Sequence, residues 1–319
     1  MNIYAHKDAN IRKTWALLTV FFVVVIGFGY VLNVYFNNPT ILVIAVVISV
    51  ATSIISYWYS DRIVLSMANA RPVTRGHAPD LYAIVENLSI AAGLPMPKIY
   101  MVHDTAPNAF ATGRNPEHAV VAVTTGLLER LNRTELEGVI AHELSHIGNR
   151  DMLVSTVVVV LVGIISIAGN MAMRSFMWGG MRGRDSRDRG NGALFAVFAI
   201  LGVILLPIAA TLIQLAISRK REFLADASGA LLTRYPEGLA SALLKISADP
   251  HAVTSANNTT AHLWFENPFK ADSTSSPQAD STGSPRADSG KGAKEMSWFV
   301  KLFLTHPPVA DRVAALRGK

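Results

Sequence analysis

Residues 141–146 read AHELSH, in which His142 and His146 stand four positions apart and Glu143 directly follows the first histidine. Residues four apart share one face of a helix, so both imidazoles can bind one metal ion while the carboxylate stands beside it. The pattern predicts a helix with two metal ligands and a general base, as in zinc-dependent peptidases. The alternative is a surface helix that carries two histidines by chance.

The residues around this stretch also favour a helix. Thr134 is a candidate N-cap, with Glu137 three residues further on as in a capping box. Apolar residues recur through the segment at helical spacing. They are Leu136, Val139, Ile140, Leu144 and Ile147.

The composition indicates a membrane protein. Half of the 319 residues are hydrophobic, only 16% are charged, and the mean hydropathy is +0.31. Lys, Arg, Asp and Glu are absent from three long runs, residues 14–60, 152–173 and 190–218. These lengths predict about four transmembrane helices. Their approximate ranges are 15–36, 40–59, 152–172 and 193–217, and the alternative for the last two is a re-entrant or surface-lying pair.

The charge and the cysteine content exclude several classes of function. The chain has no cysteine, so disulfides, cysteine-based zinc sites and thiol nucleophiles are excluded. The net charge of +6 is attributed to the basic flanks of membrane spans, because no interleaved basic and aromatic pattern indicates nucleic-acid binding. The lipid bilayer is therefore an expected partner and nucleic acid is not.

The distribution of basic residues predicts the orientation. Lys7, Arg12 and Lys13 precede the first span, which predicts a cytoplasmic amino terminus. With four crossings, residues 61–151 and the carboxyl-terminal part also lie in the cytoplasm. The arginine-rich loop 174–189 opposes this orientation, because four crossings place it outside.

A catalytic zinc site needs a third protein ligand, and Glu222 is the predicted one. An even number of crossings separates it from His146, and it stands near the end of a span, at about the depth of the metal helix. Asp226 lies four residues further on the same face and is predicted to accept the outer N–H of a ligating histidine. The competing ligands are His77, His103, His118 and Glu266. The alternative for the two carboxylates is a solvated helix face.

Two β-rich runs, residues 98–103 and 118–124, flank a segment rich in Pro, Asn and Gly, residues 105–115. They are predicted to form a hairpin whose edge could hold an extended substrate, and the alternative is a purely structural hairpin. Helices are expected over residues 80–92 and 236–248.

These elements predict a mainly α integral membrane protein with a zincin-like α+β catalytic domain. The catalytic domain comprises residues 61–151 with the metal helix, 218–254 with the third ligand, and 297–319. Transmembrane hairpins cover residues 1–60 and 152–217. A low-complexity linker covers residues 255–296, in which Ala-Asp-Ser recurs every eight residues.

Taken together, the motifs resemble those of the HtpX membrane zinc metallopeptidases, relatives of the CAAX prenyl proteases. The resemblance covers most of the chain outside the Ser/Pro-rich tract. It rests on Asn108–Gly113, Ala141–His146, Ser218–Asp226, and His306-Pro307 with Arg312.

The resemblance implies one zinc ion per chain, bound by His142, His146 and Glu222, with Glu143 as the catalytic base. It implies further roles near the reaction centre: Asn108, Ala109 and Phe110 border the substrate channel, His306 faces the reaction centre, and Arg312 supports it.

The family acts in quality control of membrane proteins. Misfolded or damaged membrane proteins are therefore the expected substrates, cut at the cytoplasmic face of the bacterial inner membrane, and other quality-control proteins are candidate partners. A dedicated peptide or prenyl-protein processing protease is the enzyme alternative. A membrane scaffold or transporter subunit is the non-enzyme alternative, although the predicted spans hold no ionisable group for a proton relay.

Overall fold

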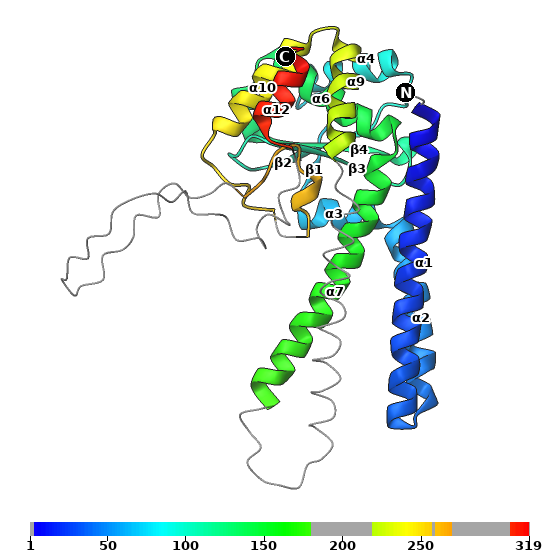
Figure 1. Ribbon diagram of the computed structural model, residues 1–319. Helices are drawn as coiled ribbons and strands as arrows, with labels where there is room; N and C mark the ends of the chain where they lie inside the picture. Colours follow the sequence, from blue (N-terminus) through cyan, green and yellow to red (C-terminus); the bar gives the residue numbers. More distant parts are fainter. Residues whose placement is uncertain (1–2, 180–218, 257–258, 270–306, 319) are drawn as a thin grey trace, which may run out of the picture.

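Two long apolar helices begin the chain. The computed structural model describes residues 3–179, 219–256, 259–269 and 307–318. Helices α1 (Ile3–Phe36) and α2 (Pro39–Trp58) lie side by side and project from the body of the molecule (Figure 1). The turn between them is short because Asn37 adopts a positive φ of 48° and the side chain of Asn38 caps α2 by accepting from the N–H of Thr40.

The prediction of four spans is confirmed in part. Within the described residues, two stretches are long and apolar enough to cross a membrane on their own, Asp8–Gly27 and Pro39–Trp58. Helix α7 (Asp151–Gly179) begins where the third span was predicted, and it adds a third candidate only when joined to α6 (Arg133–Gly148) as a bent pair. The predicted fourth span lies outside the described residues.

The body is built around a sheet of four short strands in the order β1-β2-β4-β3. The strands are β1 (Arg71–Pro72), β2 (Lys98–Val102), β3 (Ala109–Thr112) and β4 (Val120–Thr124). The two β-rich runs of the sequence form β2 and β4, but the predicted hairpin is wrong, since these strands are parallel neighbours. The segment between them supplies β3, which pairs antiparallel with β4 and forms an edge of the sheet.

Both faces of the sheet are covered. Side chains alternate along a strand, so Val121 and Val123 of β4 face one core while Val120 and Ala122 face the other. The first core is made with α4 (Pro79–Ala92), α5 (Thr125–Arg130), α6, α10 (Pro236–Ala248) and α12 (Val309–Leu316). The second core is made with α3 (Ser60–Met67), residue Val159 of α7, and the segment containing the 3-10 turn η2 (Ala261–Leu263). A further 3-10 turn, η1 (Pro116–His118), leads into β4.

Helix α6, which carries the sequence motif, begins at a different cap from the one predicted. Its N-cap is Asn132, whose side chain accepts from the N–H of Glu135, while the Glu135 carboxylate accepts from the N–H of Asn132. The predicted Thr134 cap is therefore wrong by two residues. At its other end α6 meets α7 at an angle of 82°, through Asn149 and Arg150, and Arg150 has a positive φ of 57°.

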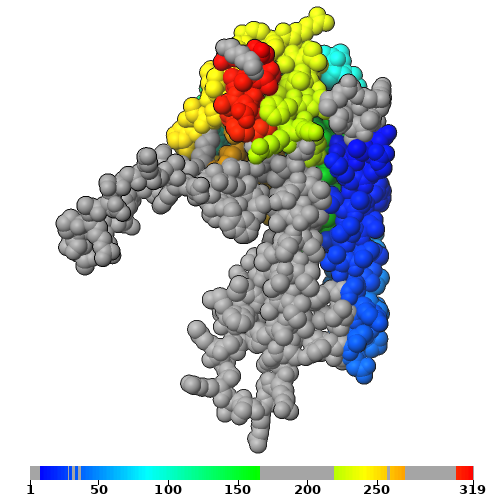
Figure 2. Space-filling model, viewed as in Figure 1, coloured from blue at the N-terminus to red at the C-terminus, as the bar shows by residue number. Residues whose placement is uncertain are grey.

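Two further contacts hold the parts together. Helix α1 packs against α7 through an apolar cluster that contains Leu17, Phe21, Val157 and Leu161. On the outside of the body, α12 lies against α10 and α9 (Arg219–Thr233), as Figure 2 shows. The predicted domain boundaries stay a prediction, and the Ser/Pro-rich tract lies outside the described residues.

Candidate metal centre

Helix α6 presents two histidines to one point. His142 is buried, and its Nε2 lies 3.1 Å from the Nε2 of His146. The four-residue spacing on a regular helix is enough to bring the two rings together. Glu143 lies beside them and is buried, and it lines a small cavity together with both histidines.

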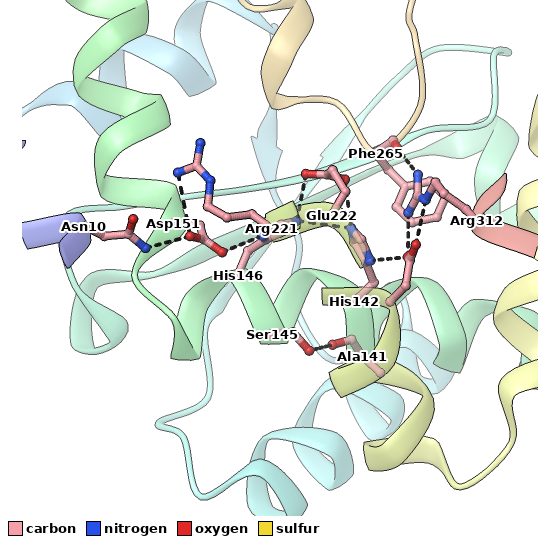
Figure 3. A network of polar contacts seen from close by, with 11 residues as sticks. Asn10, Ala141, His142, Ser145, His146, Asp151, Arg221, Glu222, Phe265 and Arg312 are labelled. Carbon is pink, nitrogen blue, oxygen red and sulfur yellow. Dashed lines mark hydrogen bonds and ion pairs between the residues drawn. The ribbon is translucent and has the colours of Figure 1, made fainter. Parts of the chain in front are cut away.

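Helix α9 supplies the third group. Glu222 Oε2 lies 3.7 Å from His142 Nε2, and Oε1 lies 3.6 Å from His146 Nε2 (Figure 3). Of the described residues, His142, His146 and Glu222 form the group that could hold a metal ion, with ligand atoms within 4.8 Å of one another. The competing candidates His77, His103, His118 and Glu266 do not belong to this group.

The donor set and its spacing fit zinc. A tetrahedral ion with bonds of about 2.0–2.2 Å requires ligand atoms about 3.3–3.6 Å apart. The three separations observed, 3.1, 3.6 and 3.7 Å, lie close to that requirement. Two histidines and one glutamate leave a coordination position open for water, as catalytic zinc sites do.

Each histidine is held from behind by a carboxylate. Asp226 Oδ1 lies 2.9 Å from His142 Nδ1, and the guanidinium of Arg312 donates two hydrogen bonds to the same carboxylate. Burial alone would lower the pKa of His142, but in the metal-free chain the carboxylates of Asp226 and Glu222 outweigh it and raise the pKa to about 9. Burial alone would raise the pKa of Asp226, but the bonds from Arg312 and His142 lower it to about 2.

The partner of the second histidine was missed by the sequence analysis. His146 Nδ1 lies 3.1 Å from Asp151 Oδ2 at the start of α7. The other oxygen of Asp151 accepts a hydrogen bond of 2.7 Å from Asn10 of α1, and Arg221 Nη1 lies 3.7 Å from it (Figure 3). The only signal in the sequence was a carboxylate five residues after the motif.

The cavity over these groups is small, with a volume of about 40 Å³. A void needs about 10–15 Å³ to hold one water, so there is room for an ion and its water. Its walls combine the metal helix, α7, α9, β3 and the segment after η2. They include Ala111, Glu143, Asp151, Arg221, His262 and Trp264.

Part of the β3 edge is covered by the chain itself. The N–H of Phe265 donates to the carbonyl of Ala109 at 2.7 Å. The Asn108 side chain donates to the Glu266 carbonyl at 2.9 Å and accepts from the Glu266 N–H at 3.2 Å. Asn108 thus binds backbone of this segment, and Phe110 is buried against Trp264, 4.9 Å between ring centroids.

The backbone groups of β3 alternate in direction, toward β4 and away from it. Thr124 N–H donates to the Asn108 carbonyl, so along this antiparallel pair Asn108, Phe110 and Thr112 direct their backbone groups toward β4. The backbone groups of Ala109 and Ala111 therefore point away from it. Of the predicted substrate-binding residues none lines the cavity, whereas Ala111 does. Their role stays a prediction, and His306 lies outside the described residues.

Comparison with known proteins agrees with this geometry. The model of peptidase family M48 matches residues 76–319. A protease HtpX homolog from Tropheryma whipplei (strain Twist) is 41% identical over 315 residues, 99% of this chain and 98% of the relative. One from Pyrococcus furiosus is 45% identical over 307 residues, 96% of this chain and 94% of the relative. The crystal structure of S. mikatae Ste24p aligns with 98% of this chain and 66% of that chain, at 18% identity and a TM-score of 0.46.

The apolar helices, the His-His-Glu site, the family match and the HtpX relatives define a membrane metallopeptidase. The chain belongs to peptidase family M48, and its full-length relatives are HtpX-type proteases, as the sequence motifs predicted. The scaffold or transporter alternative is set aside.

Proposed function

We propose that this protein is a zinc endopeptidase that cuts misfolded or damaged membrane proteins at the cytoplasmic surface of a bacterial inner membrane. The observation that carries the proposal is the convergence of His142, His146 and Glu222 with Glu143 at one small cavity. Three ligands and an adjacent carboxylate are what metal-assisted peptide hydrolysis requires.

Zinc held by these three side chains would supply a Lewis acid that polarises the scissile carbonyl and makes water a nucleophile near neutral pH. Glu143 takes a proton from the attacking water and delivers it to the departing amine. Its place on α6, one residue after His142, keeps the carboxylate at the cavity without a change of backbone.

The ligating atoms are held ready by the two aspartates behind them. Asp226 Oδ1 lies 2.9 Å from His142 Nδ1 and Asp151 Oδ2 lies 3.1 Å from His146 Nδ1. Each carboxylate would accept from an Nδ1–H, which would fix the tautomer and leave both Nε2 lone pairs directed to the metal. The predicted role of His306 is to donate to the tetrahedral oxyanion, and loss of such a donor costs about a hundredfold or more in rate.

An extended substrate would pair with the β3 edge at Ala111, where no other strand of the described sheet pairs. The backbone groups of Ala111 point away from β4, and this residue lines the cavity. Main-chain pairing makes few demands on side chains, which suits a protease that accepts many damaged proteins. A mixed sheet with an edge strand beside the metal helix also supports the zincin-like description of the body.

Several contacts support a site close to the membrane surface. Aromatic rings gather where α2 ends, with Trp15 stacked on Tyr57 at 5.9 Å and Arg114 over Trp58 at 4.7 Å. Such aromatic and basic clusters are typical of the membrane interface. Helix α7 starts five residues after His146 and packs against α1. The metal centre therefore lies only a few helical turns from the aromatic cluster.

The test is cleavage of casein, an unfolded reporter, by detergent-purified protein with and without zinc. We expect zinc-dependent cleavage in the wild type. It should fall at least a hundredfold in Glu143→Gln with zinc still bound, and vanish in Glu222→Ala with zinc weakly bound. Glu137→Gln, on the exposed side of the same helix, is the matched control and should retain activity. Equal activity in all variants would reject this site as the catalytic centre.

Orientation has its own test, because the chain contains no cysteine. Single cysteines at Ile90 and Leu231, 74% and 78% exposed, can be labelled with a membrane-impermeant maleimide. We expect both to react in inside-out vesicles and neither in intact cells. Labelling in intact cells would reject the cytoplasmic orientation.

A further inference from the structure

Asn10 links the first membrane helix to the metal centre. Its side-chain N–H₂ donates to Asp151 Oδ1 at 2.7 Å (Figure 3). It also donates to the carbonyl of Asn149 at 3.0 Å, so the amide binds two acceptors. Both Asn10 and Asp151 are buried, at 3% and 4% exposure. Buried polar groups are hydrogen-bonded almost without exception, but these bonds join residues 141 and 139 positions apart.

The two acceptors lie on either side of a corner in the chain. Asn149 ends α6, Asp151 begins α7, and Arg150 between them has a φ of 57°, which a non-glycine residue adopts at a cost. The helices meet at 82°. By binding both sides of this corner, Asn10 fixes the place of the Asp151 carboxylate, whose other oxygen contacts His146 Nδ1 at 3.1 Å.

We propose that Asp151 and Asn10 are positioning residues for His146, so that helix α1 helps to orient a ligand of the metal centre. The proposal rests on the metal site of the proposed function. Asp151 would orient the imidazole and fix its tautomer, and Asn10 would hold Asp151 in place. Neither residue belongs to the group of candidate metal ligands, which is His142, His146 and Glu222.

The arrangement parallels that on the other histidine. Arg312 binds Asp226 with two hydrogen bonds, and Asp226 binds His142. Each ligating histidine is thus held by an aspartate, and each aspartate is fixed by a residue from an opposite end of the chain. The α1 contact is supported along its length by apolar packing of Leu17 and Phe21 on α7.

The first test is zinc affinity, measured by competition with a chelator on full-length protein in detergent. Loss of an outer partner of a metal-bound histidine typically weakens metal binding by about 10–100-fold. We expect a loss in this range for Asp151→Asn. The asparagine side chain has the same shape but only one acceptor oxygen, so it cannot accept from both Asn10 and His146. Asn10→Leu has a similar volume without hydrogen bonds and should lose about tenfold. The visible absorption of the cobalt-loaded protein should also change in both.

Two controls separate positioning from general damage. Thr14 lies one turn from Asn10 in the same helix, and its buried hydroxyl donates to the Asn10 carbonyl, so Thr14→Val removes a local hydrogen bond. Asp104→Asn alters a buried carboxylate that accepts hydrogen bonds from Thr254 and from the N–H of Ala106, neither of which is a candidate metal ligand. Both should keep wild-type zinc affinity and cobalt absorption, even where the unfolding temperature falls.

The double variant decides whether Asn10 acts through Asp151. If it does, the double variant should bind zinc almost as tightly as Asp151→Asn alone, because Asn10→Leu causes no further loss of affinity. Additive losses, or wild-type zinc affinity in both single variants, would overturn the inference while leaving the proposed function intact. A wild type that binds no zinc overturns the proposed function first. Should Asp151→Asn not fold, Asn10→Leu with its Thr14→Val control decides the question alone.

Discussion

Arg312 and Asp226 form a buried ion pair with two hydrogen bonds, Nε to Oδ2 at 2.8 Å and Nη2 to Oδ1 at 2.7 Å. The side chain of Arg312 is fully buried, although it lies in the short last helix of the described chain. The same carboxylate contacts His142 at 2.9 Å. Residues near the carboxyl terminus therefore contribute to the geometry of the metal site.

Removal of Arg312 should destabilise the protein and weaken metal binding together. Arg312→Ala leaves the Asp226 carboxylate buried without its cation, and such a change costs about 3–5 kcal/mol. We expect a loss of unfolding free energy of this order, measured by denaturant titration, and weaker zinc binding. Arg312→Lys keeps the charge but not the paired geometry and should fall between.

The matched control for this pair lies just after the end of the same helix. Arg317 pairs with Glu237 at the surface, where solvent screens the charges. Arg317→Ala should leave zinc affinity and unfolding free energy unchanged. If both arginine variants behave alike, the buried pair has no special part in the site.

Gly229 sets the approach of α9 to α6. A Cβ at this position would lie 3.0 Å from the backbone N of His142 and 3.2 Å from the carbonyl carbon of Ala141. Gly229→Val should therefore push away the helix that carries Glu222. We expect a loss of about 1–3 kcal/mol in stability, as overpacking typically costs, and a clear loss of zinc affinity.

A valine elsewhere on α9 provides the comparison. Leu231 is 78% exposed, so Leu231→Val changes helix propensity without a steric conflict. It should retain zinc affinity. Retention of zinc affinity by Gly229→Val as well would contradict the claim that close packing of α9 positions Glu222.

The sequence predicted the parts of the site that depend on local spacing. His142, Glu143 and His146 are fixed by one helix, and Glu222 could be placed by counting membrane crossings. Asp151 lies only five residues beyond the motif, but across a corner whose 82° angle no local pattern specifies. Asn10 could not have been found, because a contact over 141 positions leaves no signal in a single sequence.

The pairing of strands in the sheet also could not be predicted from local sequence. The β-rich runs at residues 98–103 and 118–124 were recognisable as strands, but which strands pair depends on the whole body. The short β3 segment, AFAT, lies among Pro, Asn and Gly residues between the two runs of the predicted hairpin. The cap of α6 was also ambiguous, since Asn132/Glu135 and Thr134/Glu137 have the same spacing. Tertiary contacts of Glu135 with Ser241 and Lys245 accompany the first choice.

Glu135 predicts a pH dependence of stability. Burial would raise its pKa, but the hydrogen bonds from Lys245, Ser241 and the Asn132 N–H lower it below the usual 4.5. A carboxyl with a lower pKa in the folded chain stabilises the fold above its unfolded pKa, and this contribution is lost as pH falls through the folded value. Glu135→Gln should thus cost about 1–3 kcal/mol at neutral pH, with a difference from wild type that shrinks at acidic pH. A difference independent of pH, in urea titrations from pH 7 downward, would count against the ionised network.

Metal removal should be visible as a loss of stability. An ion that binds only the folded chain stabilises it by about 2.7 kcal/mol at a concentration 100 times Kd. Chelation should therefore lower the unfolding temperature of the wild type, and zinc should restore it. Glu143→Gln should show the same shift because its side chain is no ligand, whereas Glu222→Ala should show little shift at the same zinc concentration. A full shift in Glu222→Ala would mean that the stabilising zinc binds elsewhere, and the assignment of the third ligand would have to be withdrawn.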